Sequence, residues 1–132
     1  MAKTWCEKLK GGKPPHVEVT TKAFAGIPVG SKMLISSPME FRDYINQVKG
    51  SQTVAELKEA LAKRHGAETV CPLTTGIFLR IVAEAAYDEI EAGKSPSDVT
   101  PFWRVISPKD KVAGKLRCGP EFIAAQRLAE GI

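Results

Sequence analysis

The chain has 132 residues, of which 43% are hydrophobic and 26% charged, and its net charge is +4 at neutral pH. This length and apolar content suit a single packed domain and exclude a disordered chain. No apolar run approaches the roughly 20 residues of a membrane span, and the first residues lack the apolar centre of a secretory signal. Three cysteines without a C-x-x-C pair favour neither disulfides nor structural zinc, so a cytoplasmic protein without metal or cofactor is expected.

Glycine and proline are concentrated near the N-terminus, which predicts an irregular segment over 1–30 with one short strand in HVEVTT. The folded domain is expected over 31–132. It begins with SKMLISS (31–37), which is a second candidate strand or a lead-in to the first helix.

Capping signals predict the helices that follow. Ser37-Pro38-Met39-Glu40 and Thr53-Val54-Ala55-Glu56 are capping boxes, each followed by apolar residues at helical spacing. With later apolar stripes and glycine stops, they predict four helices, at 38–48, 53–65, 75–92 and 120–130. The expected core contains apolar residues from the first three helices and the segment after them, namely Ile45, Leu57, Leu61, Phe78, Ile81 and Val105.

Two short segments between the last two helices, 102–106 and 111–116, flank the turn SPKD and predict a β-hairpin. Two helices joined by a short connection and followed by a hairpin are the parts of a winged helix-turn-helix. The sequence therefore predicts an α+β fold of this type, mostly helical, with a small β-hairpin wing.

Charge is distributed unevenly along the chain. Residues 1–22 and 104–127 are basic, whereas 84–98 holds five acidic residues against Lys94. This pattern suits a basic face that meets phosphates, and ordinary solvated surface is the alternative interpretation.

The stretch TPFWRVISPKDKVAG resembles the active-site segment of the O-alkylguanine-DNA alkyltransferase family, Pro-Cys-His-Arg-Val followed by a wing loop with glycines. Either IPVGSK or VKGSQTVAELKEAL is similar to the family's lead into its first DNA-binding helix, and TTGIFLRIVAEAA is similar to its recognition helix. GPEFIAAQRLAEG is similar to its closing helix. The resemblance covers residues 38–132 in the family's order and implies its C-terminal DNA-binding domain.

This sequence departs from the family at the reactive positions. Phe102 stands in place of the nucleophilic cysteine and Trp103 in place of the histidine. Alkyl transfer needs a thiolate and a base, and neither ring supplies them, so no catalytic residue is expected and the chain is not predicted to be an enzyme. Glu130 matches the closing glutamate that orients the family's histidine, and it is expected to have nothing to orient. The resemblance is therefore nearest to alkyltransferase-like proteins, which carry an aromatic at this position and bind alkylated DNA without repairing it.

Double-stranded DNA is the partner that the resemblance implies. Phe102 and Trp103 would wall a pocket for an extruded base, or else be plain core aromatics. Seven polar side chains are the predicted DNA contacts, namely Thr74, Thr75, Arg80, Arg104, Lys109, Lys111 and Lys115. The alternative for Arg80 is a pair with Glu84, and for Arg104 a structural role.

At two further positions the sequence lacks a side chain that the family uses to contact DNA. Gly76 stands where the family places the arginine that fills the gap left by the flipped base, and Val54 stands where it has a tyrosine. Two other functions therefore stay open. One is a scaffold that lost DNA binding and docks a protein partner on the acidic face of helix 75–92. The other is an enzyme using Cys71 or Cys118, unless these cysteines are idle core residues.

Overall fold

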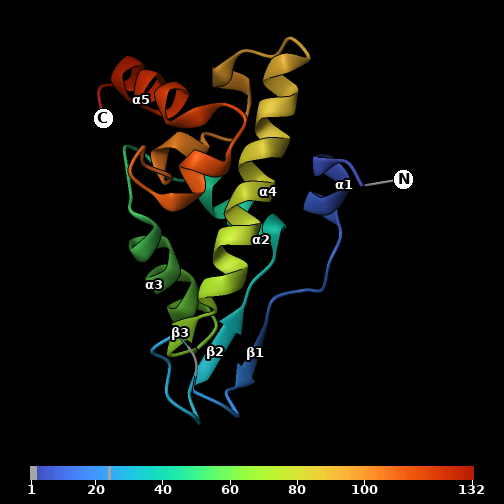
Figure 1. Cartoon of the computed structure of the whole chain (residues 1–132), viewed down its shortest axis with the longest axis vertical. Coiled ribbons are helices and arrows are strands. Elements are labelled where there is room, and N and C mark those ends of the chain that lie inside the picture. The colour runs from blue at the N-terminus through green and yellow to red at the C-terminus, as the bar shows by residue number, and fades with distance from the viewer. Residues whose placement is uncertain (1–2, 24) are drawn as a thin grey trace.

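The computed structural model describes residues 3–23 and 25–132, which form a mostly helical body with a small sheet at one end (Figure 1). In chain order the helices and strands are α1 (Trp5–Lys10), β1 (His16–Val19), β2 (Lys32–Ile35), α2 (Pro38–Asn46), α3 (Val54–Arg64), β3 (Thr69–Val70), α4 (Pro72–Glu91) and α5 (Gly119–Glu130). Three short 3₁₀ helices separate α4 from α5, namely η1 (Pro96–Asp98), η2 (Phe102–Arg104) and η3 (Lys111–Lys115). The fold class is α+β and mostly helical, as the sequence predicts.

The helix α4 forms the axis of the molecule (Figure 1). The sheet and α3 lie toward the start of α4, and α5 lies toward its end, while α1 packs along one side. Strand β1 pairs antiparallel with β2, and β2 pairs parallel with β3, in the order β1-β2-β3. The sheet therefore supports the start of α4, and the segment after α4 folds back beside it.

Local capping explains where the predicted helices begin. The side chains of Ser37 and Thr53 accept hydrogen bonds from the third backbone N–H of α2 and α3, and Thr53 forms the full capping box with Glu56. Helix α4 begins three residues before the predicted 75, because Pro72 occupies its first turn and presets the helical φ. The helices predicted at 38–48, 53–65, 75–92 and 120–130 are thus confirmed, with shifts of a few residues at their ends.

The predicted core is also confirmed. Five of the six residues named from the sequence are buried in one cluster, and Phe78 packs against it from a half-buried position. The side of α4 that faces this cluster includes Val82, Ala83 and Ala86, whose small size lets neighbouring elements approach the helix closely.

The predicted β-hairpin is wrong. Residues 102–104 and 111–115 form the 3₁₀ helices η2 and η3, held by bonds such as Val105 N–H to the carbonyl of Phe102. A half-buried strand would bury alternate side chains, but here the adjacent pairs 102–103 and 105–106 are all buried, and a tight helical turn achieves this more readily than a strand. In the described part of the chain, no strand follows α4.

The segment 1–30, predicted as irregular with one strand, contains α1 as well as β1. A capping box between Thr4 and Glu7 begins α1, and Leu9 is buried in the core. Over this segment's described residues, α1 packs on α4 and β1 pairs with β2, so neither element trails from the domain.

Candidate nucleic-acid interface

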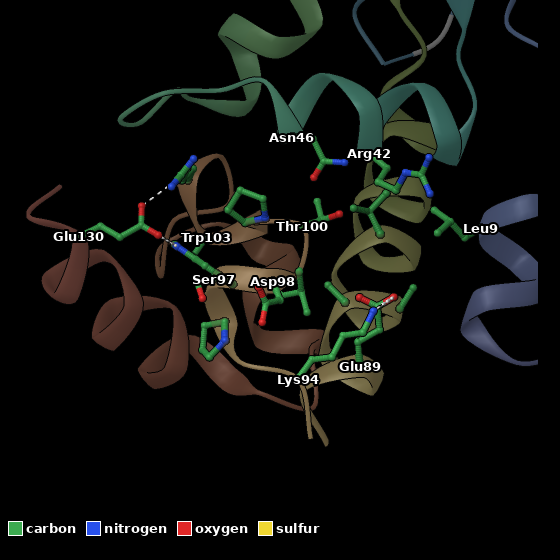
Figure 2. A pocket seen from close by; sticks show the side chains of 17 residues that line it. Leu9, Arg42, Asn46, Glu89, Lys94, Ser97, Asp98, Thr100, Trp103 and Glu130 are labelled. Atoms are coloured by element: carbon green, nitrogen blue, oxygen red, sulfur yellow. Dashed lines mark hydrogen bonds and ion pairs between the residues drawn. The ribbon is translucent and has the colours of Figure 1, made fainter. Parts of the chain in front are cut away.

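One carboxylate, that of Glu130, joins the end of α5 to η2. The Trp103 indole Nε1 donates to Glu130 Oε2 at 2.7 Å, and the Arg104 Nε donates to Oε1 at 2.7 Å (Figure 2). The two donors are adjacent in η2, whose tight turn presents both toward α5. The expectation that Glu130 has nothing to orient is wrong, because the Trp103 indole donates to it.

Further hydrogen bonds hold this centre. Arg127 Nε donates to the Trp103 carbonyl at 2.8 Å, and Arg104 Nη1 donates to the Val48 carbonyl at 2.9 Å. Burial raises the pKa of Glu130, but the hydrogen bonds from Arg104 and Trp103 and the Arg104 charge outweigh it, so the pKa lies below its ordinary value. Arg104, predicted as a DNA contact, is held between α5 and the end of α2 and takes the structural role.

Replacing Glu130 with glutamine is expected to lower the free energy of unfolding by about 1 kcal/mol at neutral pH, because the Arg104 charge loses its partner in a partly solvated site. A carboxylate with a depressed folded-state pKa stabilises the fold above its ordinary pKa of 4.5, and this contribution is lost as pH falls through the folded-state value. Urea unfolding at neutral pH and at about pH 3 should show the gap between parent and variant closing in acid. A gap of constant size would contradict this role for the charge.

A cleft of about 590 Å³ opens beside Trp103 (Figure 2). Its lining includes Trp103, Arg104 and Glu130, and the other lining residues come from α2, the second half of α4, the segment 94–101 and Leu9 of α1. The lining mixes cationic side chains such as Arg42 with anionic ones such as Glu89 and Asp98. Its charge therefore favours no single class of ligand.

Of the two aromatics predicted to wall a base pocket, only Trp103 lines the cleft. Trp103 faces the cleft with an edge only, since 1% of its surface is exposed. Phe102 is fully buried and does not line the cleft; its ring lies 5.1 Å from that of Trp103 and 6.2 Å from that of Phe122, centroid to centroid. Phe102 thus has the packing of a core aromatic, the alternative that the sequence left open.

The start of α4 holds the first group of predicted DNA contacts. Thr75 is buried, and its hydroxyl donates to the Cys71 carbonyl at 2.7 Å, so it is not free to meet a phosphate. Thr74 is half-buried, and its hydroxyl makes a longer bond of 3.4 Å to the same carbonyl. Gly76 is exposed, with open space where a side chain would stand. The first turn also presents backbone N–H groups without intrahelical acceptors, including those of Leu73 and Thr74.

Arg80 lies one turn further along α4 and is exposed, but it does not pair with Glu84. Its guanidinium lies 5.3 Å from the centre of the Trp5 ring, in a cation–π contact shared with Lys8. Arg80 therefore helps to hold α1 against α4, and this contact competes with any reach toward a phosphate.

The three lysines predicted to lie on a wing, Lys109, Lys111 and Lys115, are all exposed on or beside η3. None of them makes an ion pair in the described part of the chain. Their ammonium groups stay solvated and able to move onto a backbone phosphate, although the segment that carries them is helical and not a hairpin.

Comparisons with protein-family models, with curated proteins and with solved structures found no match to this chain. The function of the candidate site must therefore be inferred from the residues of this chain alone.

The acidic face of helix 75–92 is compensated by arginine and lysine. Glu84 is buried, with 1% of its surface exposed, and accepts from Arg117 Nε at 2.9 Å. The same guanidinium contacts Asp88 at 2.6 Å and Glu91 at 3.4 Å. Lys94 pairs with Glu89 at 3.7 Å. Each acidic residue of α4 thus has a cationic partner, which neither the charge pattern nor the spacing of residues indicated.

Cys71 and Cys118, the two cysteines considered as nucleophiles, have the surroundings of inert thiols. Cys71 is buried at the start of α4. Burial and the nearby Glu84 raise the pKa of Cys118 to about 11, outweighing the Arg117 charge expected to lower it, so near neutral pH it is a protonated and weakly nucleophilic thiol.

Within residues 3–23 and 25–132, no group of three or more His, Cys, Asp or Glu side chains is placed to hold a metal ion. No helix of these residues combines the length and the apolar character needed to cross a membrane.

Proposed function

We propose that the protein is an alkyltransferase-like, duplex DNA-binding protein without alkyl-transfer activity. The observation that carries the proposal is the hydrogen bond of 2.7 Å between Trp103 and Glu130. These residues are 27 positions apart, and the resemblance alone pairs them, as the counterparts of a histidine and the glutamate that orients it. Their direct contact supports the alignment of the whole segment 102–130 with that family.

The proposed DNA-binding unit is a winged helix-turn-helix in which a helical segment replaces the hairpin. Helices α3 and α4 supply the two DNA-binding helices, and the stretch around η3 acts as the wing. The start of α4 offers free N–H groups and the positive end of its dipole to a phosphate. Lys109, Lys111 and Lys115 add the mobile charges, so the contacts are with the DNA backbone and carry little sequence preference.

Alkyl transfer is not part of this function, because Phe102 fills the place of the nucleophile inside the core. Extrusion of a base into a pocket walled by both aromatics is not proposed either, since Phe102 faces no part of the cleft. Any recognition of modified DNA would depend on Trp103 alone.

A protein-binding scaffold is the second candidate function. It was expected to dock a partner on the acidic face of α4, but four of the carboxylates there already pair with Arg117 or Lys94. A partner would have to break these pairs to use the charge. This observation supports the proposal of DNA binding over a docking role for this face.

Replacing Lys109, Lys111 and Lys115 together with glutamine is expected to weaken binding to a short fluorescein-labelled duplex about equally for all sequences. Each lysine that neutralises a phosphate adds about one unit to the negative slope of log affinity against log salt, so the variant should show a flatter slope. Fluorescence anisotropy over a salt series starting at about 50 mM measures both quantities.

The matched control replaces Lys10, Lys13 and Lys22 with glutamine. These lysines are exposed in the N-terminal segment, and their replacement removes the same amount of charge. The control should keep most of the parent's slope. If both triple variants lose binding equally, net charge and not the proposed surface drives association. If the parent binds no duplex at about 50 mM salt, the DNA proposal fails and the protein-interaction function takes its place.

A further inference from the structure

A second groove, of about 360 Å³, lies between the N-terminal segment and the body of the domain. Its volume is within the range of small-molecule sites. Apolar side chains from the body line one side of it, namely Ile35 at the end of β2 and Phe78 and Ile81 on α4. Phe78 and Ile35 are only half-buried, so part of this apolar wall remains open to solvent.

The other side of the groove is basic. Lys3, Lys8 and Lys13 line it, and no aspartate or glutamate does. His16 also lines it, but its ring is engaged by Glu18 at 3.1 Å and by the Pro14 carbonyl at 3.2 Å. The charge of the groove therefore comes from the three lysines.

Among the described residues, carboxylates offset the charge of these lysines only in part, since Lys3 lies near enough to Glu7 to help lower the pKa of that carboxyl. Lys3 and Lys13 make no ion pair among the described residues. Lys8 places its Nζ 4.4 Å from the centre of the Trp5 ring, a contact that leaves its charge in place. The larger cleft beside Trp103 differs, because both acidic and basic side chains line it. Three like charges around one groove repel one another, and a bound anion relieves that repulsion.

We propose that this groove binds a small amphipathic carboxylate. The hydrocarbon body lies against Ile35, Phe78 and Ile81, and the carboxylate is held among the three lysines. Burying the apolar wall supplies the non-directional part of the affinity, and the ammonium groups fix the orientation. The site is separate from the proposed DNA surface and does not depend on it.

Sodium octanoate is the probe, and the side-chain methyl signals of Ile35 and Ile81 in carbon-resolved NMR spectra are the readout. Saturable shifts are expected, with a dissociation constant on the order of 1 mM for a ligand of this size. Octanamide has the same chain without the charge, and acetate has the charge without the chain. Each should bind at least about tenfold more weakly, because each lacks one half of the recognition.

Two double variants test the lysines. K3E/K13E should weaken octanoate binding roughly tenfold, whereas K10E/K22E, an equal charge change at exposed lysines that do not line the groove, should stay within about twofold of the parent. Circular dichroism establishes that both variants fold like the parent.

Three outcomes would overturn the proposal. If octanamide bound as tightly as octanoate, the lysines would not contribute to binding through the ligand's charge. Octyl phosphate binding at least about tenfold more tightly than octanoate would replace the carboxylate with a phosphate ligand. Shifts at Val82 or Val99, which line the other cleft, without shifts at Ile35 and Ile81 would place the ligand elsewhere.

Discussion

Replacing Phe102 with alanine is expected to lower the free energy of unfolding by about 3–5 kcal/mol, the loss typical of a large ring removed from a packed core. The ring is fully buried and packs between Trp103 and Phe122. Removing it leaves a cavity that the surrounding 3₁₀ turn, held by Glu130 and Arg127, cannot close. Chemical denaturation of parent and variant measures the difference.

Phe102→Leu serves as the milder companion variant, with a loss of about 1–2 kcal/mol expected from the change of shape. DNA affinity of either folded variant should equal that of the parent, because the ring contributes to packing and not to the interface. A loss of stability below about 1 kcal/mol for the alanine variant, accompanied by weaker binding to alkylated DNA, would instead make Phe102 a wall of a base pocket.

Replacing Arg117 with methionine is expected to destabilise the fold by about 2–3 kcal/mol. The change leaves the buried carboxylate of Glu84 with the Arg117 backbone N–H, 3.3 Å away, in place of a charged partner. The expected loss lies below that for a fully buried pair because 44% of the Arg117 side chain is exposed. Urea unfolding at neutral pH gives the value.

The double variant Glu84→Leu with Arg117→Met should recover at least half of that loss, since it removes the buried charge together with its partner. Arg42→Met breaks an exposed pair with Asp43 and should change stability by less than about 1 kcal/mol. If Arg117→Met were as mild as Arg42→Met, the Arg117 contacts would contribute nothing beyond ordinary surface charge.

Local signals in the sequence were sufficient for the regular helices. Capping residues such as Ser37 and Thr53 act within one turn of the chain, so their effect can be read without knowing the fold. Apolar spacing identified Leu57, Leu61 and Ile81 as core residues for the same reason. The short strand β1 followed from the alternation in HVEVTT, and β2 was one of two interpretations of SKMLISS.

Elements stabilised by distant contacts were harder to predict. Strand β3 has two residues and exists because Thr69 and Val70 pair with Met33 and Leu34, far away in the chain. The apolar run around Phe102 suited a strand by composition, but burial of adjacent side chains against α4 and α5 made it helical.

The candidate site shows the same division. Exposure of the three wing lysines was predictable from their position beside a turn. The ion pairs of Arg104 with Glu130 and of Arg117 with Glu84 were not predictable. Each pair forms only after α5 and the segment before it fold back. The acidic stretch of α4 looked like a free surface in the sequence for this reason.

The most direct test of the proposed function is to map a short DNA duplex onto the ¹⁵N-labelled protein by NMR at about 50 mM salt. The account predicts saturable shifts of backbone amides in two places, the first turn of α4 at 73–77 and the segment 107–115, and their loss as salt is raised. Shifts concentrated instead on 84–98 or on 3–16, or no shifts at any ratio of DNA to protein, would contradict it.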